Sequence, residues 1–327
     1  MESLPRIQDA YRKMYPYANF KLEVIAQKVV RCLNYCSPPQ YTRTSLFFTG
    51  GVDATSALIE EIEDNALLIN IWGGDVSVKD MSSHAELESY LDGLSKAMNL
   101  QYVFIKSNCR ELFNESRVTK MLATKIFPWH NHGWWASIAH ILSMSTLVAP
   151  LSYVAKIGIN YIASSYDAKS STFDANNDTL LAAIRFGECK LEPVDSNLER
   201  AEKVKKIIDF SSTHKIKLDL KVCWFRKAGK NCSHCEKCYR TVLEILAAHG
   251  DPNAFGFAVS TNTYREVKEY VKTNYVNTGF WKPIQAAFEK ERDYWLGQPE
   301  ISWILDAKLN SVKALARKVV TTMKKFI

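Results

Sequence analysis

The sequence predicts an α/β protein whose core is an open parallel sheet with helices on both faces. Short runs rich in β-forming residues at 44–48, 66–72 and 101–106 alternate with helical segments at 54–62 and 82–98. Single helices between strands imply crossover connections, which make neighbouring strands parallel. The composition agrees, because 47% hydrophobic and 24% charged residues are globular proportions and exclude a disordered or collagen-like chain.

The remaining elements follow from apolar periodicity and turn residues. We expect a helix over 4–14 and then a strand or helix over 20–33, which a Ser-Pro-Pro turn ends. Further along we expect, in order, a helix at 134–148, a strand at 153–163, an exposed loop at 167–178, a helix at 198–210, a strand at 218–224, a helix at 235–248 and an all-helical remainder from 263.

One uncharged stretch, residues 133–155, has the length of a membrane span. It contains His140, four serines and Pro150, so it is less apolar than a bilayer helix should be. We interpret it as a buried helix, a break at Pro150 and a buried strand. Residues 1–9 carry acids and no apolar segment, so we expect no secretory signal and a cytoplasmic protein without a membrane span. The net charge of +7 tolerates an anionic ligand but does not by itself predict nucleic-acid binding.

The first chemical signal lies between a predicted strand and a predicted helix. The segment is Phe48-Thr49-Gly50-Gly51-Val52-Asp53-Ala54-Thr55. Two adjacent glycines allow a tight turn and a close approach of the backbone to an anion, and the N–H groups at a helix start favour negative charge. Thr49 and Thr55 add hydroxyl groups, and Asp53 suits a cation such as Mg²⁺ that bridges phosphate oxygens. A plain Gly-Gly turn is the simpler alternative.

This segment resembles the Ser-Gly-Gly-x-Asp-Ser signature of the PP-loop (N-type) ATP pyrophosphatase family. The resemblance implies an adenine nucleotide alpha hydrolase-like fold, with the signature after the first strand. It also implies cleavage of ATP between the α and β phosphates and transfer of AMP to a substrate. Thr49 and Ala54 replace the two serines of the signature, and Thr55 places a hydroxyl beside Ala54. The change at Ala54 keeps open a catalytically inactive nucleotide-binding module.

Four of the eight cysteines lie within sixteen residues and predict a metal site. Cys223, Cys232, Cys235 and Cys238 have the spacing C-x8-C-x2-C-x2-C. In a chain without an export signal, such clustering favours metal binding over disulfides. Four thiolates complete a tetrahedral zinc shell with no open position, which is the structural arrangement. An iron–sulfur cluster is the alternative, and we expect His234 to be exposed rather than a ligand.

The loop and the cysteines, in this order, closely resemble the 7-cyano-7-deazaguanine synthase family over residues 46–248. The resemblance implies an ATP-dependent ligase that adenylates a carboxylate or carbonyl substrate, releases AMP and pyrophosphate, and joins a nitrogen nucleophile to give a nitrile or an amide. It implies ATP, Mg²⁺ and structural Zn²⁺ as cofactors. The Asp-Cys-Arg stretch of the family is not evident, and Ala163-Ser164-Ser165-Tyr166-Asp167 stands in a comparable place, so we expect a divergent paralogue. Relatives occur in bacterial anti-phage gene sets, where a deazapurine conjugated to a partner is conceivable.

On this resemblance the chain divides into three segments. Residues 1–40 are an N-terminal appendage, and 41–250 are the PP-loop ATP-binding catalytic domain with its four-cysteine zinc element at 223–238. Residues 251–327 are a helical C-terminal extension. Its end, 308–325, is basic and amphipathic, which predicts either a docked helix or a surface for nucleic acid, an acidic partner or a membrane. We expect a homo-oligomer.

Further candidate residues lie where predicted strands end, since open α/β sheets bind ligands there. We expect the nucleotide to contact residues 48–55 and the strand end formed by Ile71, Trp72 and Gly73. Asp75 then meets ribose or Mg²⁺, or serves only the turn. Ser164, Ser165 and His132 are candidate substrate contacts, His132 lying in an aromatic run at 129–135 that forms either a substrate wall or a helix start packed on the core.

Two basic residues complete the expected site. Arg200 and Lys203 lie one helical turn apart, and the family resemblance implies a basic group that neutralises the leaving pyrophosphate. With Asp53 they are the candidate catalytic residues; a solvated helix face is the alternative for both. Thiolation of tRNA or of a small molecule is a second function to weigh, with Cys109 or Cys189 as the sulfur carrier.

Overall fold

The computed structural model describes residues 3–16, 18–21, 23, 41–61, 66–122, 133–164, 177–223, 225, 229–312 and 315. The chain forms two compact units, each drawn from separate stretches of sequence. The first unit comprises Met1–Thr49, Ser56–Met81 and Leu91–Leu198, and the second comprises Gly50–Thr55, Ser82–Tyr90 and Glu199–Ile327.

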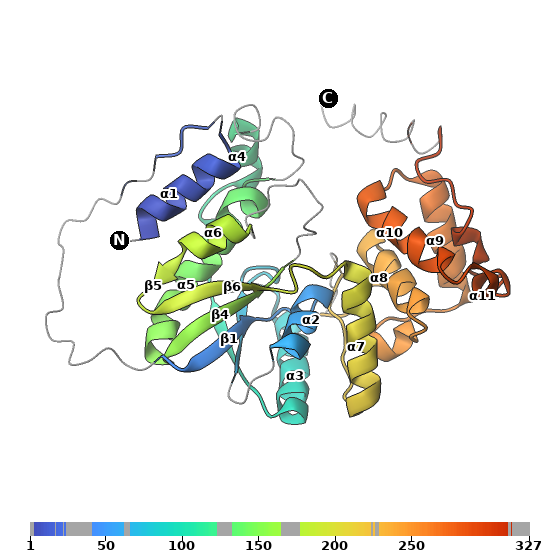
Figure 1. Ribbon diagram of the computed structural model, residues 1–327, viewed down its shortest axis with the longest axis horizontal. Coiled ribbons are helices and arrows are strands. Elements are labelled where there is room, and N and C mark those ends of the chain that lie inside the picture. The colour runs from blue at the N-terminus through green and yellow to red at the C-terminus, as the bar shows by residue number, and fades with distance from the viewer. Residues whose placement is uncertain are drawn as a thin grey trace, which may run out of the picture. The chain divides into compact units, whose positions relative to one another are not determined.

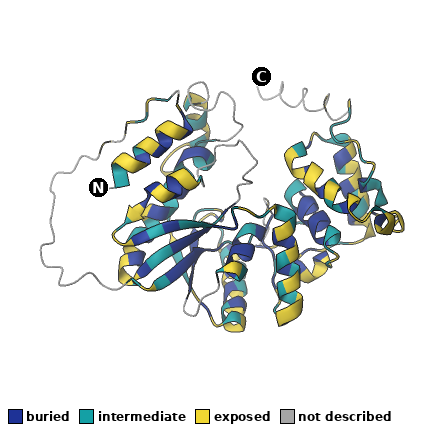
Figure 2. Ribbon diagram, in the orientation of Figure 1, coloured by how far each residue is buried: buried dark blue, intermediate teal, exposed yellow. Residues whose placement is uncertain are grey.

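The first unit is built on a six-stranded sheet in the order β3-β2-β1-β4-β6-β5. Figure 1 labels β1, β4, β6 and β5 of this sheet. The strands are β1 (Arg43–Phe47), β2 (Leu67–Trp72), β3 (Gln101–Lys106), β4 (Ile157–Ala163), β5 (Arg185–Phe186) and β6 (Cys189–Val194). All neighbours are parallel except β5, which pairs antiparallel with β6. All six residues of β2 are buried, so both faces of the sheet are covered at this strand. Figure 2 shows buried residues, in dark blue, along the strands of the sheet. The predicted α/β class and mostly parallel sheet are confirmed.

The strand order reverses between β1 and β4. The chain passes from β1 to β2 and β3 on one side, then returns to place β4 on the other side of β1. Ser45 of β1 is in register with Leu67 of β2 and with Asn160 of β4. In open α/β sheets, ligands bind outside the carboxyl ends of strands at such a reversal. Phe48 and Thr49 leave the sheet at this point.

Three helices share one apolar core with the sheet. They are α1 (Ser3–Met14), α5 (His140–Val154) and α6 (Asp178–Ala183). In α1 the buried residues Ile7, Ala10, Tyr11 and Met14 recur at helical spacing, which gives the helix one apolar face. The predicted helix at 4–14 is therefore confirmed, and it packs into the core of the first unit, in contact with α6. The segment expected at 20–33 lies mostly outside the described residues.

The other helices around the sheet connect strands. They are α2 (Val52–Glu60), α3 (Met81–Met98), the short turn η1 (Cys109–Glu111) and α4 (Glu115–Leu122). Helices α2 and α3 confirm the helical periodicity at 54–62 and 82–98. Each of them contributes its first turns to the second unit and its remainder to the first.

The prediction for residues 133–155 was wrong in two respects. The helix continues through Pro150 to Val154, and the strand starts only at Ile157. Pro150 leaves the carbonyl of Thr146 without a helical N–H, but both residues are exposed or partly exposed, so water can satisfy that carbonyl. The stretch is also less buried than expected: by length and composition alone Trp135–Val154 would suffice to cross a membrane, and 33% of the apolar window is buried.

The second unit is helical in most of the residues that the structure describes there. Its helices beyond residue 199 are α7 (Arg200–His214), α8 (Glu236–Ala247), η3 (Pro252–Phe255), α9 (Thr261–Thr273), α10 (Thr278–Glu289), α11 (Arg292–Leu296) and η4 (Ser302–Ile304). A core around Trp281, Phe288 and Leu243 joins α8 to α10 and α11. The strand expected at 218–224 does not form, since residues 216–223 lie in neither helix nor strand. Their backbone bonds to loops instead, as when Leu220 N–H donates to Phe255 O at 3.0 Å.

Candidate functional site

The Gly50–Gly51 turn leads from β1 into α2 by a left-handed step. Gly50 has φ +74°, and Thr55 N–H donates to Gly51 O at 2.9 Å as the helix begins. A Cβ on Gly50 would lie 3.0 Å from the Lys221 side chain, so a larger residue meets both strain and crowding there. The first N–H groups of a helix have no intrahelical partner, and this turn places them beside the glycine pair.

Lys221 holds this turn and was missed by sequence analysis. Its N–H donates to Gly50 O at 2.7 Å, and its buried ammonium donates to Glu86 Oε1 at 3.3 Å. The ammonium also lies 5.2 Å from the centre of the Tyr90 ring. A lysine between Leu220 and Val222 in an apolar run was the available signal, since a buried lysine needs a partner.

Asp53, in the first turn of α2, forms ion pairs with two basic side chains of α7. Lys203 Nζ lies 3.2 Å from Asp53 Oδ1, and Arg200 Nη1 lies 3.6 Å from Asp53 Oδ2. Lys203 is almost fully buried, with 3% of its side chain exposed, whereas 28% of Asp53 is exposed. The three candidate catalytic residues are thus brought together, and the solvated-face alternative does not hold for Lys203.

Arg200 is positioned from behind by α8. Its Nε donates to both carboxylate oxygens of Glu244, at 2.9 and 3.0 Å, and its Nη2 donates to Thr241 Oγ1 at 3.0 Å. Glu244 is 5% exposed, so the guanidinium is held in one orientation by a buried carboxylate. The sequence did not indicate Thr241 or Glu244, which lie more than forty residues away along the chain.

Burial and charge act in opposite directions on this pair. Burial raises the pKa of the Glu244 carboxyl above its ordinary value, although Arg200 and Arg240 oppose that change. Burial lowers the pKa of Arg200, but the negative charges of Glu244 and Asp53 outweigh it and raise that pKa overall. Arg200 therefore stays charged at neutral pH.

The other residues of the loop can contact a ligand through their backbone rather than through their side chains. Val52, Ala54 and Thr55 are buried, and Thr55 N–H already donates to Gly51 O, so the N–H groups of Val52 and Ala54 are what these residues can offer a ligand. Thr55 Oγ1 is buried and has no hydrogen-bond partner among the described residues. The replacement of a serine by Ala54 thus falls at a buried position, where the side chain packs.

The strand end expected to contact a nucleotide is tightly packed within the first unit. Gly73 has φ +113°, and a Cβ there would lie 1.7 Å from Ser107 O. Trp72 Nε1 donates to Ser77 O at 3.1 Å, and Ile71 and Trp72 are 8% exposed. Asp75 is exposed in the following turn. Glycine is required at position 73 because the turn after β2 passes close to the backbone of Ser107, which follows β3. Sequence analysis did not assign this role to Gly73.

The expected substrate contacts are described only in part. Ser164 follows β4 and is 2% exposed, and its N–H donates to Val194 O at 2.9 Å. His132 and Ser165 lie outside the described residues. Trp134 and Trp135, which end the aromatic run, line a cavity in the first unit.

The four cysteines come together as the sequence predicts. The sulfur atoms of Cys223, Cys232, Cys235 and Cys238 all lie within 4.8 Å of one another. Three of the separations are 3.5, 3.9 and 4.0 Å. Four sulfurs at about 2.3 Å from a zinc ion, in a tetrahedron, would be about 3.8 Å apart. The cluster could therefore hold a metal ion such as zinc.

Two features fit the cysteines to a metal. Phe225 N–H donates to Cys223 Sγ at 3.2 Å and His234 N–H donates to Cys232 Sγ at 3.4 Å, contacts that stabilise thiolates. His234 itself is exposed and bonds Glu266 through Nδ1 at 2.7 Å, so it is not a ligand in this arrangement.

The cysteine cluster is anchored to the helical core. Cys235 is the N-cap residue of α8, and the next residue, Glu236, accepts from Trp281 Nε1 at 3.1 Å. The Asn231 amide accepts from the N–H groups of Val222 and Cys223 and donates to Leu220 O and Gly256 O. One side chain therefore satisfies four backbone groups around the segment before the cluster.

The chain is therefore an α/β protein with an open, mostly parallel sheet. It also carries a cluster of four cysteines that could hold a metal ion. No protein-family model matches the chain, and no curated protein matches it.

Proposed function

We propose that the chain is a PP-loop ATP pyrophosphatase that activates a carboxylate with Mg²⁺-ATP and joins it to a nitrogen nucleophile, in the manner of the 7-cyano-7-deazaguanine synthases. One observation carries this proposal: Lys203 and Arg200 converge on Asp53 one turn after the Gly50–Gly51 bend. Two fixed cations beside a glycine turn and a helix start form a site for a polyphosphate.

In the proposed reaction the substrate carboxylate attacks the α-phosphorus of ATP and pyrophosphate leaves. A nitrogen nucleophile then displaces AMP, which yields an amide. A nitrile needs a second ATP, which adenylates the amide oxygen so that this oxygen leaves with AMP. The loop N–H groups bind phosphate oxygens, and Lys203 and Arg200 stabilise the charge that develops on pyrophosphate. Glu244 and Thr241 keep the Arg200 guanidinium in place while it does so.

Asp53 has two successive partners in this proposal. Without nucleotide its carboxylate neutralises Lys203 and Arg200. Incoming phosphates offer those cations new anionic oxygens, which releases Asp53 to hold Mg²⁺. One carboxylate is enough, because Mg²⁺ is usually bound by one or two carboxylates together with substrate phosphates and water. The metal would neutralise phosphate charge when bound. The four cysteines would hold a structural Zn²⁺.

The test compares ATP with AMP. We expect calorimetric titration to show Mg²⁺-ATP binding to the wild type, and Lys203→Met to weaken ATP much more than AMP. In pyrophosphate-release assays with purine and deazapurine carboxylates, the same variant should lose roughly 100-fold in rate. Lys205→Met is the matched control, since Lys205 lies exposed on the same helix and pairs only with Asp209 among the described residues. No heat with ATP, or full activity of Asp53→Asn, would contradict the proposal.

Thiolation is the weaker candidate. Cys189 is fully buried, and burial raises its pKa to about 11, so it is a poor sulfur carrier. Cys109 is partly exposed and remains the candidate carrier. Full sulfur transfer by both Cys109→Ala and Cys189→Ala would exclude a carrier at either position. An inactive nucleotide-binding module would bind ATP without releasing pyrophosphate. Cytoplasmic location and a homo-oligomer belong to the same proposal.

A further inference from the structure

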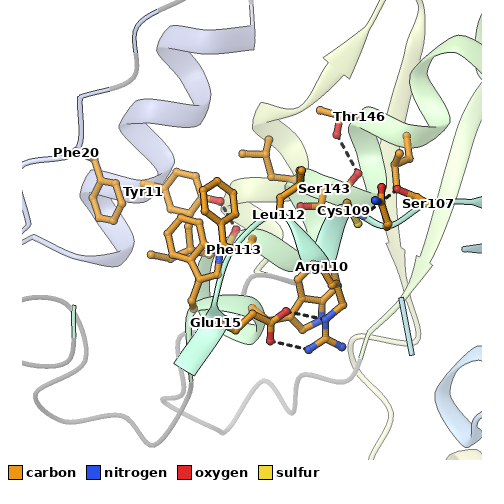
Figure 3. A pocket seen from close by; sticks show the side chains of 17 residues that line it. Tyr11, Phe20, Ser107, Cys109, Arg110, Leu112, Phe113, Glu115, Ser143 and Thr146 are labelled. Carbon is orange, nitrogen blue, oxygen red and sulfur yellow. Dashed lines mark hydrogen bonds and ion pairs between the residues drawn. The ribbon is translucent and has the colours of Figure 1, made fainter. Parts of the chain in front are cut away.

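The cavity lined by Trp134 and Trp135 lies wholly within the first unit, at the carboxyl end of β3. Its volume is about 580 Å³, within the range of sites that enclose small organic molecules. Its walls come from α1, from the segment after β3 and from the start of α5 (Figure 3).

Aromatic rings form much of the wall. Figure 3 shows Tyr11, Phe20 and Phe113 grouped on one side of the cavity, with Tyr11 and Phe20 stacked at 5.2 Å between ring centres. Trp134 meets Phe113 edge to face at 6.2 Å. Phe113 is 58% exposed, which is unusual for a large apolar ring and places uncovered aromatic surface at the cavity. Rings of this kind bind flat molecules by stacking.

The α5 side of the cavity is a distorted helical turn that other residues hold in place. Trp135–Ala139 is a π-helix, a widened turn that is rare and frequent at functional sites. Tyr11 Oη donates to Ile138 O at 2.6 Å, and Tyr15 Oη donates to Ser137 O at 2.9 Å. Burial raises the pKa of Tyr11, so its hydroxyl stays a donor across the physiological range. The widened turn is therefore built into the core rather than tolerated at the surface.

A matched ion pair forms the polar end. Arg110 donates to Glu115 through Nε and Nη2, each at 2.7 Å, and through Nη1 to Gly74 O at 3.0 Å. The guanidinium also lies 4.5 Å from the ring centre of Trp135. Three of the five N–H groups of Arg110 are thus bonded within the described residues, and each Glu115 oxygen can accept a further bond. The end of the cavity offers donors and acceptors but little net charge.

We propose that this cavity binds a flat, uncharged aromatic ring whose polar edge pairs with Arg110 and Glu115. Stacking on the wall rings supplies the affinity, and the neutralised pair selects against both anions and cations. A fatty acyl chain is the alternative occupant, since Leu112, Leu142 and Leu147 also line the cavity, but it would bring no polar edge to Arg110 and Glu115. The cavity shares no residue with the Gly50–Gly51 turn, so this proposal holds whether or not the chain binds ATP.

The experiment measures binding of three probes by calorimetry and by ligand-observed NMR. The probes are indole-3-carboxamide, indole-3-carboxylate and octanoate. We expect the carboxamide to bind the wild type most tightly. Glu115→Gln leaves the Arg110 charge unmatched and should shift the preference toward the carboxylate by about tenfold, since hydrogen bonds to charged groups are the stronger ones.

Cavity-filling variants locate the site. Ser143→Phe, on the cavity side of α5, should weaken the carboxamide at least about tenfold, the loss expected when a ring can no longer enter. Val154→Phe is the control, because Val154 lies on the same helix and is 77% exposed. Ala139→Leu tests the same wall with a smaller change if Ser143→Phe fails to fold. The proposal is overturned if the filling variants bind as well as wild type, if octanoate binds most tightly, or if no ring binds at millimolar concentration.

Discussion

The region around the Gly50–Gly51 turn and the cavity after β3 are two candidate sites of opposite chemistry. Around Asp53 the second unit gathers charged side chains, and both of the cations there lie within 4 Å of the carboxylate. Around Trp135 the first unit gathers rings and a single neutralised pair. The charged region depends on partners that hold each side chain in one place, whereas the aromatic region depends on shape. The two should respond differently to mutation, pH and metal removal.

The largest expected effect is a difference between the two units in how far their stability depends on a bound metal. Cys235→Ser removes one of the four sulfur atoms of the cluster, at the N-cap position of α8. Structural zinc contributes about 10–16 kcal/mol in small peptides, which is comparable to the whole stability of a domain, about 5–15 kcal/mol. We expect loss of bound zinc by elemental analysis, and loss of amide protection in α8, α9 and α10 by hydrogen exchange. Strands β1 to β4 should keep their protection.

Cys109→Ser is the control for that experiment, because Cys109 lies outside the cluster and is only partly buried. A Cys235→Ser protein that keeps its metal and its helical protection would mean that the two units do not differ in this way.

The next effect concerns the buried charges. Arg200→Met leaves Glu244 without the N–H that donates to both of its oxygens and should lower the free energy of unfolding by about 3 kcal/mol at pH 7. Without Arg200 the pKa of Glu244 rises further above its unfolded value, so the carboxyl takes up a proton at a higher pH. The loss should therefore be largest above neutral pH and should shrink toward pH 5.

A double variant sharpens that measurement. Arg200→Met with Glu244→Met replaces the pair by apolar groups and should recover most of the stability. Urea unfolding of the wild type, the two single variants and the double variant gives the coupling energy. Additive losses would show that the two residues do not act as a pair.

A smaller loss of stability is expected at the end of β2, where Gly73 packs closely against the backbone. Gly73→Ala places a Cβ against Ser107 O at φ +113° and should cost about 2–3 kcal/mol. Gly93→Ala is its matched control: a Cβ at Gly93, within α3, meets nothing within 4 Å. That variant should gain about 0.5–1 kcal/mol, because glycine is a poor helix residue. Equal urea midpoints for the two variants would contradict the packing described at Gly73.

The smallest effect is chemical. Burial raises the pKa of Cys189 to about 11, so its thiolate is scarce at pH 8 and alkylation by iodoacetamide should be slow. Cys109 is partly exposed and should react first. Mass spectrometry of labelled peptides from pH 7 to 10 checks this order. Faster labelling of Cys189 would show that the first unit opens readily around β6.

The fold was predictable where the pattern is local. The strands at 44–48, 66–72 and 101–106 and the helices between them follow from runs of a few residues, and the structure confirms them. Pro150 misled the prediction because the helix continues through it to Val154, at an exposed turn where water can reach the carbonyl of Thr146. The strand expected at 218–224 fails because its backbone bonds go to Gly50 and Phe255, which the sequence places far away.

The same distinction holds for the sites. The glycine pair and the C-x2-C spacing are contiguous, so the sequence shows them. Lys203 and Arg200 were identified as one pair on one helix, but Glu244 and Lys221 were not, since only folding brings them to Arg200 and Gly50. The cavity combines Tyr11, Arg110 and Trp135 from three distant stretches, and no period or motif links them.

The interleaved chain path has a consequence for how the protein is made. The second unit needs Gly50–Thr55 and Ser82–Tyr90, which leave the ribosome long before Glu199 does. At about 5–20 residues per second, those segments wait on the order of ten seconds for their partners. No single cut in the polypeptide yields either unit intact. Expression of isolated fragments should therefore give insoluble material, whereas co-expressed halves have a route to assemble.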